Sequence, residues 1–233
     1  GAIHASKVVT TPADPRDGVR HGVEVALATA GLTGDAISRF VHGTTLATNA
    51  LLERQGARTA FATTAGFGDM LRLGRATRVG EARYDLLFAP PSPPVDDDMT
   101  FEVDERVLAS GAVHRALDAG HVADVVARIA ATKPEAVAIC FLHAYANPSH
   151  EEAFAEACRA AMPGVFVVSS CETWPEMREY ERATTALACA YVGPVMASYL
   201  HGLQQMLRGI GVTCPVQIME SSGGVLSAAL AAR

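Results

Sequence analysis

The stretch EAVAICFLHAYANPSHEEAF, residues 135–154, decides the fold class of this chain. Residues 136–142 form an uninterrupted apolar run, which is typical of a strand buried on both faces of a sheet. A helix is predicted from about residue 149 to residue 161, and the acidic residues of its first turn suit the helix dipole. A buried strand that leads directly into a helix is the repeating unit of α/β proteins.

The same alternation of strands and helices continues on both sides of this unit. Further predicted strands cover residues 3–9, 37–42, 58–63, 100–107 paired with 112–118, 166–169 and 216–219. Further predicted helices run from a cap at Asp17 to residue 30, over 45–54, over 118–131, and over 175–208 with a break at Gly193-Pro194. Residues 76–98 end in a proline-rich stretch that predicts an exposed connector. This order predicts an α/β fold with an at least partly parallel sheet.

The composition predicts a soluble, globular protein. Hydrophobic residues make up 49% of the chain and charged residues 19%, which is not a disordered composition. The net charge is -6 and the basic residues are scattered, so nucleic acid is not an expected partner. The five cysteines form no C-x-x-C pair, and we see neither a secretory signal nor a membrane span. We therefore expect a cytoplasmic protein with no membrane contact.

The stretch HGTT, residues 42–45, follows a predicted strand and precedes a predicted helix, which is where α/β proteins bind ligands. Thr44 and Thr45 could donate hydroxyl hydrogens to an anion or a carbonyl. Asn49 lies one helical turn after Thr45 and could face the same spot. Alternatively, a threonine caps the helix and Asn49 is a satisfied polar group in an interface. The residues alone leave both interpretations open.

Three arginines, Arg72, Arg75 and Arg78, recur every third residue beside the glycine-punctuated stretch GFGDMLRLG. They could form one positive stripe next to a bound anion, or simply a solvated helix face. His143 follows the apolar strand and could act as a general acid or base, because histidine exchanges protons near neutral pH. A lone histidine is, however, more often merely hydrogen-bonded.

Charged residues are dense in WPEMREYERATT, residues 174–185. The spacing of three predicts helical ion pairs between Arg178 and Glu181 and between Glu179 and Arg182, as part of a network that locks two segments. In ESSGGV, residues 220–225, Gly223 and Gly224 allow close approach of a ligand or form an ordinary turn. The SSGG portion is also a predicted start of a last helix.

Together these pieces resemble the hydantoinase A family. The stretches HGTTLATNALLERQGARTAFATTAGFGDMLRLGR, AVAICFLHAYANPSHEE, REYERATT, AYVGPVMASYL and IMESSGG occur in that family's order over practically the whole chain. The family includes ATP-dependent N-methylhydantoinases, 5-oxoprolinases and β-type subunits of acetone and acetophenone carboxylases, within the actin-like ATPase superfamily. The resemblance implies a ribonuclease-H-like lobe with a mixed sheet and flanking helices. Residues 1–183 would hold most of the first lobe and 184–233 the start of the second.

The resemblance implies an ATP-dependent hydrolase of cyclic amides that activates a carbonyl by phosphoryl transfer, with Mg²⁺ in the intact protein. Alternatives are a ketone carboxylase subunit and a non-catalytic interaction module. The implied partners are a small cyclic amide or ketone and a hydantoinase B-type subunit or domain, in an oligomer. No catalytic residue and no metal ligand is assigned. The implied cleft residues are Thr44, Thr45, Asn49 and Arg75 on the substrate side, Glu179 and Arg182 at the lobe junction, and His143, Gly223 and Gly224.

The family grips phosphate with two glycine-rich loops of the type D-x-G-G-T-x-T-D, and neither loop occurs within the 233 residues. We therefore expect an internal part of a longer subunit, truncated at both ends, that releases no measurable phosphate from ATP by itself. A phosphate-release assay on purified residues 1–233 tests this, with a subunit extended on both sides as the positive control. Robust ATP hydrolysis by residues 1–233 alone would contradict the prediction.

Overall fold

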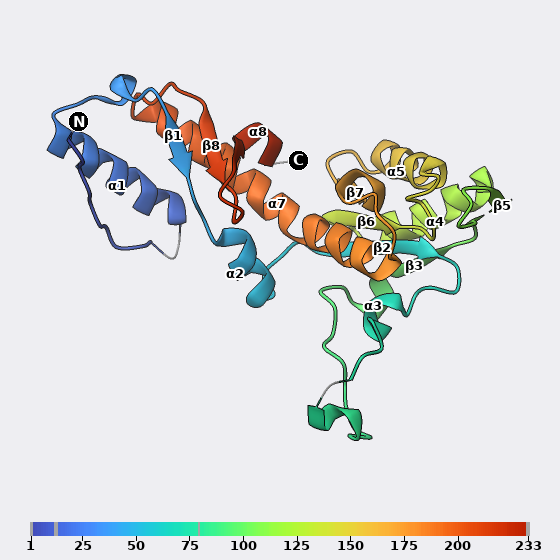
Figure 1. Ribbon diagram of the computed structural model, residues 1–233. Helices are drawn as coiled ribbons and strands as arrows, with labels where there is room; N and C mark the ends of the chain where they lie inside the picture. Colours follow the sequence, from blue (N-terminus) through green and yellow to red (C-terminus); the bar gives the residue numbers. More distant parts are fainter. Residues whose placement is uncertain (1, 12–13, 79, 232–233) are drawn as a thin grey trace. The chain divides into compact units, whose positions relative to one another are not determined.

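A computed structural model describes residues 2–11, 14–78 and 80–231 of the chain (Figure 1). The fold is α/β, as predicted, and it divides into two compact units. The larger unit is Asn49–Pro194, and the smaller unit combines Gly1–Thr48 with Val195–Arg233. The helix α2, Leu46–Leu52, and the long helix α7, Glu179–Gly209, each run from one unit into the other.

A four-stranded parallel sheet forms the centre of the larger unit. Its strands lie in the order β3 (Thr100–Val103), β2 (Thr59–Thr64), β6 (Ala136–Cys140) and β7 (Phe166–Ser169). Every residue of the two inner strands is buried, which explains why their sequences do not alternate between apolar and polar residues. Since all four strands are parallel, their carboxyl ends meet at one edge of the sheet.

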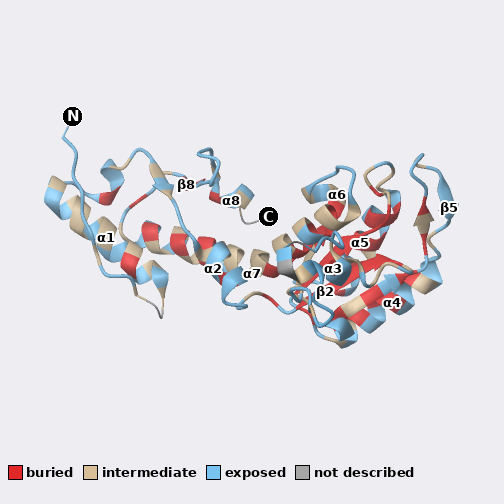
Figure 2. Cartoon of the chain, turned by 60° about the horizontal axis from the view of Figure 1, so that its bottom comes forward, coloured by how far each residue is buried: buried red, intermediate tan, exposed pale blue. Residues whose placement is uncertain are grey.

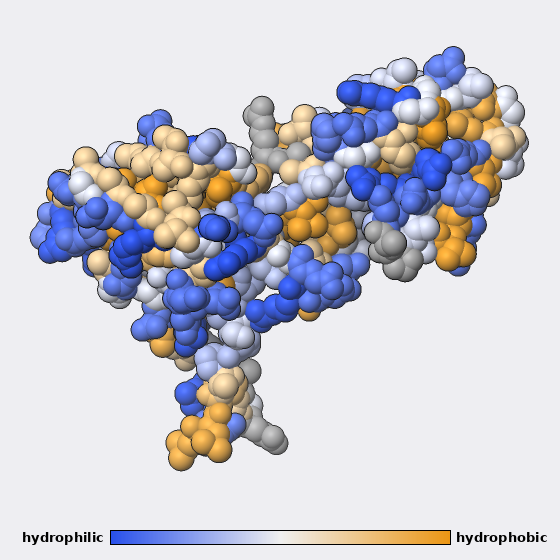
Figure 3. Space-filling model, turned by 180° about the vertical axis from the view of Figure 1, so that it is seen from behind, coloured by the Kyte–Doolittle hydropathy of each residue, from blue (hydrophilic) through white to orange (hydrophobic). Residues whose placement is uncertain are grey.

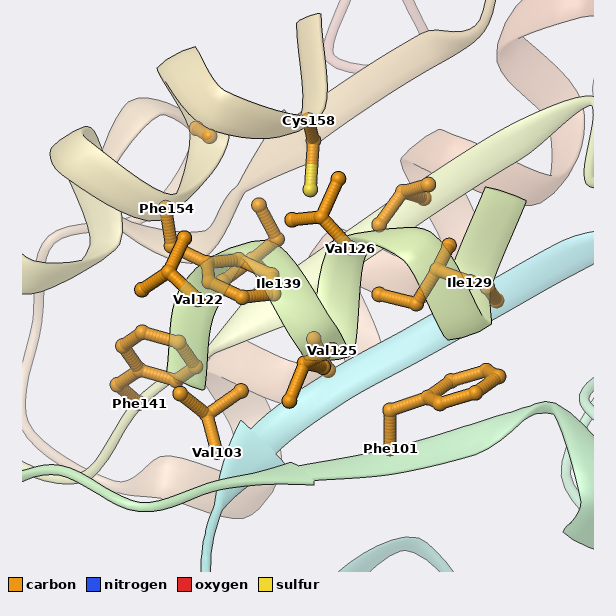
Figure 4. Close-up of a cluster of buried hydrophobic side chains, with 14 of the residues drawn as sticks. Phe101, Val103, Val122, Val125, Val126, Ile129, Ile139, Phe141, Phe154 and Cys158 are labelled. Carbon is orange, nitrogen blue, oxygen red and sulfur yellow. The ribbon is translucent and has the colours of Figure 1, made fainter. Parts of the chain in front are cut away.

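One face of this sheet is covered by helices α4 (Ala119–Ala131) and α5 (Ser149–Ala161) (Figure 2). Ile139 of β6 points into this core and meets large apolar side chains from both helices (Figure 4). Val137 belongs to the same buried cluster. The rings of Phe141 and Phe154 meet edge to face with their centroids 5.5 Å apart. Burial of this set supplies the main hydrophobic stabilisation of the unit.

The opposite face of the sheet is covered by the first half of α7. The alternate residues of β6, Ala136, Ala138 and Cys140, face this helix. The helix presents small residues in return, among them Ala183 and Ala186, which lie in the same buried cluster. Small side chains on both surfaces let helix and sheet approach closely. The alternation of large and small residues along β6 therefore assigns each face of the strand to a different partner.

The remaining elements of the larger unit connect these layers. They are α3 (Met70–Leu73), η2 (Gly80–Arg83), η3 (Asp97–Met99), the antiparallel pair β4 (Arg106–Val107) and β5 (Val113–Arg115), and α6 (Ser170–Thr173). The pairing of β4 with β5 confirms part of the predicted hairpin. The predicted strand 100–107 is divided, however, because residues 100–103 form β3 and pair in parallel with β2 instead. Apart from residue 79, the stretch 76–98 has only short turns and is largely exposed, as predicted. Leu86 and Leu87 are more than nine-tenths exposed, and Figure 3 shows hydrophobic surface at the end of this connector.

The smaller unit holds a three-stranded mixed sheet. Strand β8 (Val216–Met219) pairs in parallel with β1 (Phe40–His42) and antiparallel with β9 (Val225–Ser227). Its buried cluster combines residues from the second half of α7 with residues from this sheet and from the short helix α8, Ala228–Ala231. The helix α1, Pro15–Ala30, and the short turn η1, Gly34–Ala36, complete the unit.

Two N-terminal predictions are wrong. Residues 3–9 form no strand, because apolar alternation makes a strand only where a neighbouring strand supplies hydrogen bonds. Helix α1 begins at Pro15 and is capped by Asp14, not Asp17. The Asp14 carboxylate accepts a hydrogen bond of 2.9 Å from the Arg16 backbone N–H. Proline at the first helical position needs no hydrogen-bond partner for its nitrogen, which favours this start.

Two C-terminal predictions are also wrong. Helix α7 starts at Glu179 and continues through Pro194 without a break. An internal proline costs about 3 kcal/mol, but both halves of α7 are anchored in buried clusters, and this burial outweighs the cost. The SSGG stretch opens no helix; it forms the turn between β8 and β9, where Gly223 has a φ of 89°.

Among the residues described, α7 is the one helix long and apolar enough to cross a membrane by length and composition. Its apolar residues have another explanation in this fold. Ala183, Ala186 and Leu187 are buried against the four-stranded sheet, and Leu200 and Leu203 are buried in the smaller unit. The helix therefore owes its apolar character to two cores rather than to one uniform surface.

Gly56 marks a close contact between the chain entering β2 and helix α7. A Cβ atom on Gly56 would lie 2.1 Å from the ring of Tyr191, and the Ala57 N–H donates to the Tyr191 carbonyl at 2.8 Å. We predict that Gly56→Ala destabilises the protein by ~1–3 kcal/mol, because the ring cannot move without disturbing a packed helix. Urea unfolding measures this loss.

The matched control is Gly209→Ala, at the end of α7, where a Cβ atom would meet nothing within 4 Å. This change is expected to be neutral or to stabilise the protein by about 0.4–1 kcal/mol. In a Tyr191→Ala background, Gly56→Ala should cost little, because the clashing ring is gone. An equal cost of Gly56→Ala with and without the tyrosine ring would show that the contact is not the cause.

Candidate functional site

A buried ion pair lies where strands β6 and β7 end. Arg182 and Glu151 are both 0% exposed, with Nη1 of the arginine 3.8 Å from Oε1 of the glutamate. The hydroxyl of Ser170 bridges them, since it donates to Oε1 at 2.7 Å and accepts from Nη1 at 3.0 Å. Arg182 Nη2 also donates to the Phe141 carbonyl at 2.5 Å. Two buried charges are tolerated here because they are paired and hydrogen-bonded.

The Glu151 carboxylate is the acceptor on which this site depends. Its two oxygens also accept hydrogen bonds from the Phe141 N–H at 2.6 Å, the Ser169 hydroxyl at 2.8 Å and the Cys171 N–H at 3.0 Å. These donors come from the ends of β6 and β7 and from α6, while Glu151 itself lies in the first turn of α5. One carboxylate thus ties together the chain segments at the carboxyl edge of the sheet.

A second buried carboxylate, Glu105, extends this polar network toward β2. Its Oε1 accepts a short hydrogen bond from the Thr64 hydroxyl, and its Oε2 lies 2.7 Å from His150 Nδ1. The Thr64 hydroxyl in turn accepts from the Leu142 N–H at 2.8 Å. The backbone just before His143 is therefore held from two sides, by Glu151 and by Thr64.

His143 follows this fixed backbone and has a left-handed φ of 57°, which is strained for a residue other than glycine. Its Nδ1 lies 3.4 Å from Oε1 of Glu179, and the two side chains are 25% and 22% exposed. The alignment is too poor for a hydrogen bond, so Nδ1 has no partner among the described residues. The site presents a half-buried imidazole beside a carboxylate, an arrangement that can take up or release a proton.

The first turn of α7 carries Glu179, Tyr180, Glu181 and Arg182, and their partners lie far away in the sequence. Glu179 faces His143, Arg182 enters the buried pair, and Oε1 of Glu181 accepts from Arg75 Nε at 2.7 Å. The predicted pairs Arg178–Glu181 and Glu179–Arg182 do not form. Arg178 precedes the helix and has a φ of 93°, while burial gives Arg182 a better-shielded partner in Glu151.

A cavity of about 640 Å³ lies beside this turn of α7. Arg72, Arg75 and Arg78 all contribute to its lining, so the structure brings the three arginines to one cavity. The rest of the lining is mostly apolar and includes the rings of Phe88 and Tyr180. Gly74 packs against Tyr180 with a φ of 55°, a conformation that favours glycine.

The HGTT stretch lies in the smaller unit, and the Thr44 hydroxyl accepts a hydrogen bond of 3.2 Å from the Leu46 N–H, at the start of α2. The capping interpretation is therefore confirmed for Thr44. Thr45 and Asn49 are exposed. The interface role of Asn49 stays a prediction. The roles of these residues as ligand contacts stay predictions.

His42, from the same stretch, is half-buried, and its Nε2 lies 2.9 Å from the Tyr199 hydroxyl. Burial lowers the pKa of His42 and raises the pKa of Tyr199. Both groups are therefore neutral at pH 7, and the hydroxyl and the ring nitrogen share one hydrogen bond.

Gly223 and Gly224 lie in an exposed turn of the smaller unit. The Glu220 N–H donates to the Gly224 carbonyl at 2.9 Å, and the Gly223 N–H donates to the Glu220 carbonyl at 3.0 Å. A Cβ atom on Gly224 would lie 2.8 Å from the Glu220 carboxylate. The local geometry accounts for both glycines as turn residues, and a ligand role for them stays a prediction.

Comparison with known proteins assigns the family. Residues 1–162 match the model of the hydantoinase/oxoprolinase N-terminal region, and residues 182–233 match the hydantoinase/oxoprolinase model. The chain belongs to the hydantoinase/oxoprolinase family. The resemblance seen in the sequence is thereby confirmed. The predicted division cuts the chain once, after residue 183, whereas the smaller compact unit combines residues from both ends of the chain. The predicted division between lobes stays a prediction.

Relatives within the hydantoinase/oxoprolinase family match almost the whole chain. An uncharacterized protein of Methanocaldococcus jannaschii is 35% identical over 96% of this chain and 32% of its own length. The caprolactamase subunit alpha of Pseudomonas jessenii is 30% identical over 97% of this chain and 33% of its own length. The acetophenone carboxylase gamma subunit of Aromatoleum aromaticum is 30% identical over 96% of this chain and 33% of its own length.

The crystal structure of the ATP-dependent caprolactamase from Pseudomonas jessenii superimposes with a TM-score of 0.87. The match covers 97% of this chain and 33% of that one, at 30% identity. The chain thus spans about a third of the length of these relatives. The likeness shows that this part of the hydantoinase/oxoprolinase fold is shared in detail.

The family's ATP-dependent members raise the question of a metal ion. No three His, Cys, Asp or Glu side chains in the described part of the chain lie close enough to hold one together. Cysteine nucleophiles are disfavoured as well. Burial raises the pKa of Cys140 to about 12 and also raises the pKa of Cys171, so both remain thiols at neutral pH. The proton-transfer candidate of the larger unit is therefore the pair of His143 and Glu179.

Sequence reasoning missed Glu151, Glu105, His150, Ser169 and Ser170 as members of the site. Acids in a first helical turn usually face solvent, and that expectation concealed Glu151. A usable signal was present, because Ser169-Ser170 ends an apolar strand with two hydroxyls. Buried hydroxyls at such a place need polar partners.

We predict that Arg182→Met costs about 3–5 kcal/mol in unfolding free energy, because it leaves the Glu151 charge buried without a cation. Urea denaturation gives the measurement. The double variant Arg182→Met with Glu151→Gln should lose less than Arg182→Met alone, because the charge is removed as well.

The matched control is Arg159→Met, which removes an arginine whose pair with Glu172 is exposed, at 43% and 52%. Exposed pairs contribute about 0–1 kcal/mol, so this variant should unfold nearly as the original protein does. Similar losses in Arg182→Met and Arg159→Met would show that the buried pair has no special role.

Proposed function

We propose that this chain is part of an ATP-dependent hydrolase of cyclic amides, in which a carbonyl is activated by phosphoryl transfer. The observation that carries the proposal is the likeness to the ATP-dependent caprolactamase, with a TM-score of 0.87 and 30% identity over 97% of this chain. Caprolactam is a cyclic amide, and the family description also names oxoprolinases. Because this chain spans about a third of such relatives, the activity is proposed for the whole protein.

Transfer of the γ-phosphoryl group of ATP to the amide oxygen would release ADP and make the carbonyl carbon more electrophilic. Water would then add to that carbon, and the C–N bond would break with the ring nitrogen taking up a proton. Hydrolysis of the remaining acyl phosphate would release phosphate and the ring-opened amino acid.

Phosphoryl transfer depends mainly on positioning and on positive charge near the reacting oxygens. The chain offers positive charge at Arg72, Arg75 and Arg78, around a cavity large enough for a small ring. We assign no ligand for Mg²⁺, since the described residues hold no suitable cluster. Thr45 and Asn49 are exposed and remain free to contact a ligand.

His143 and Glu179 are proposed to handle the proton of the attacking water. The imidazole lies next to the carboxylate, with Nδ1 3.4 Å from Oε1, and is exposed enough to meet a water molecule. Arg182 contacts no open surface and instead fixes the turn that carries Glu179.

A second candidate function is that of a ketone carboxylase subunit. It is supported by 30% identity to the acetophenone carboxylase gamma subunit over 96% of this chain. The two functions share ATP-dependent activation and differ in the molecule that is activated. The named relatives are alpha and gamma subunits, so we also propose a partner subunit of the hydantoinase B type, in a cytoplasmic oligomer.

The deciding experiment measures ATP turnover by the full-length protein purified with its partner subunit. Caprolactam and 5-oxoproline are compared with acetophenone plus bicarbonate. We expect ADP release to depend on a cyclic amide and to match the appearance of the ring-opened amino acid. ADP release that responds only to the ketone with bicarbonate would favour the carboxylase, and no response to either would reject both candidates.

In the same assay we predict that His143→Gln lowers kcat roughly 10²-fold, with a smaller change in KM, because a proton-transfer group is removed. The matched control is His114→Gln, which changes an exposed histidine of β5. Equal turnover by the two variants would remove His143 from the proposal.

A further inference from the structure

We propose that the tip of the connector, residues 84–87, docks into an apolar pocket of the partner subunit. The proposal rests on the proposed function only in taking that partner to be a hydantoinase B-type subunit. Tyr84, Leu86 and Leu87 are 83%, 95% and 91% exposed, so three of the four side chains at the tip are large, apolar and in water. Contiguous exposed apolar side chains on a soluble protein mark interaction sites.

The tip is ordered by hydrogen bonds of its own. The Asp85 carboxylate accepts from the Leu87 N–H at 2.8 Å, and the Asp85 carbonyl accepts from Arg78 Nη1 at 3.2 Å and from the Phe88 N–H at 3.4 Å. The Arg78 guanidinium carbon also lies 5.4 Å from the centroid of the Phe88 ring, which is a cation–π contact. The turn is thus formed before docking, which lowers the entropy cost of association.

The connector is also anchored where it returns to the larger unit. The Arg54 guanidinium donates to the Ser92 carbonyl at 2.6 Å and to the Pro93 carbonyl at 3.0 Å. Arg72 pairs with Asp97 a few residues further on. Prolines at positions 90, 91, 93 and 94 restrict the backbone between the tip and these anchors. The connector therefore presents the tip as a fixed arm of the larger unit.

The charge of the tip segment selects among possible partners. Residues 78–88 contain two basic and two acidic residues, so their formal charges cancel; they are Arg78, Arg83, Glu81 and Asp85. Nucleic acid and anionic membrane surfaces are bound by an excess of basic residues, which this segment lacks. The contact is therefore apolar, with Tyr84 and the two leucines as anchors in a protein pocket.

A separate subunit is the occupant to which we commit, because two relatives are themselves named as subunits, alpha and gamma. Phe88 follows the tip directly and lines the arginine-lined cavity of about 640 Å³. A subunit seated on the tip would therefore lie beside the cavity in which the reaction is proposed. Docking at the tip would thus bring the second subunit to the substrate site.

The test is association of the full-length protein with the purified hydantoinase B-type subunit, measured by surface plasmon resonance. We expect the double variant Leu86→Ser with Leu87→Ser to raise Kd roughly tenfold or more, because two anchors lose their apolar surface. Its melting temperature should not change, since both leucines are exposed. An unchanged Kd, or no association of the original protein, would overturn the proposal.

The matched control is Leu32→Ser with Leu52→Ser, which changes two leucines that are 53% and 78% exposed and lie outside the connector. This variant should keep the original Kd. An equal increase in Kd in the control and in the tip variant would show a general effect of lost apolar surface, and it would overturn the assignment to the tip.

Variants of Asp85 test whether the ordered turn presents the tip. Asp85→Ala removes the acceptor of the Leu87 N–H and should raise Kd roughly threefold or more. Asp85→Asn keeps an oxygen at that place and should bind like the original protein. Equal Kd values for the two variants would overturn the role given to the turn.

Hydrogen exchange of residues 82–88 identifies what covers the tip. We expect fast exchange in the 233-residue chain and in the full-length protein, and slower exchange only after the hydantoinase B-type subunit is added. Slow exchange in the full-length protein alone would show that another part of the same chain covers the tip. Slowing that depends on the concentration of the 233-residue chain would show a second copy. Either result would overturn the proposal.

Association is measured without ATP or substrate, which keeps this inference distinct from the proposed reaction. Weakened association of the tip variant, together with no ATP-dependent ring opening by the original full-length protein, would remove the proposed reaction alone. Ring opening by the original protein, together with unchanged association of the tip variant, would remove this inference alone.

Discussion

The buried pair of Arg182 and Glu151 is the interaction on which the rest of the larger unit depends. Neither charged group is exposed to water, so each must be paired with an opposite charge or hydrogen-bonded to fixed polar groups. The groups that donate hydrogen bonds to Glu151 come from the ends of β6 and β7 and from α6. The carbonyl that accepts a hydrogen bond from Arg182 belongs to Phe141. Satisfying two buried charges therefore determines the course of the backbone at the carboxyl edge of the sheet.

The strained conformation of His143 follows from this constraint. The N–H groups of the two preceding residues, Phe141 and Leu142, are bound by Glu151 and by the Thr64 hydroxyl. The chain must then turn sharply to reach the start of α5, and it does so at His143 with a positive φ. The strain costs of order 1–3 kcal/mol and is held by the network around it. It leaves the imidazole beside Glu179 at a half-exposed position, where chemistry is possible.

The parallel sheet was predictable from sequence because its signal is local. The run of β6 is apolar throughout, β7 is apolar up to its last residue, and the observed limits of β2, β6 and β7 agree closely with the predicted ones. The ion pairs of α7 were not predictable, because spacing along one helix reveals only neighbours within that helix. The charged partners of Glu179, Glu181 and Arg182 are 31 or more residues away in the sequence, where helical spacing gives no information. The strand predicted at residues 3–9 does not form. A strand-like pattern in the sequence does not show whether a neighbouring strand is there to pair with it.

The first turn of α7 connects the structural constraint to the chemistry of the site. Arg182 is buried in the core, and if it moved away, the charge of Glu151 would remain buried without a cationic partner. The same turn must therefore hold Glu179 against His143, Tyr180 in the wall of the cavity, and Glu181 against Arg75. Relatives named for a lactamase and for a ketone carboxylase match this chain over nearly the same stretch, so the shared framework alone does not choose the substrate.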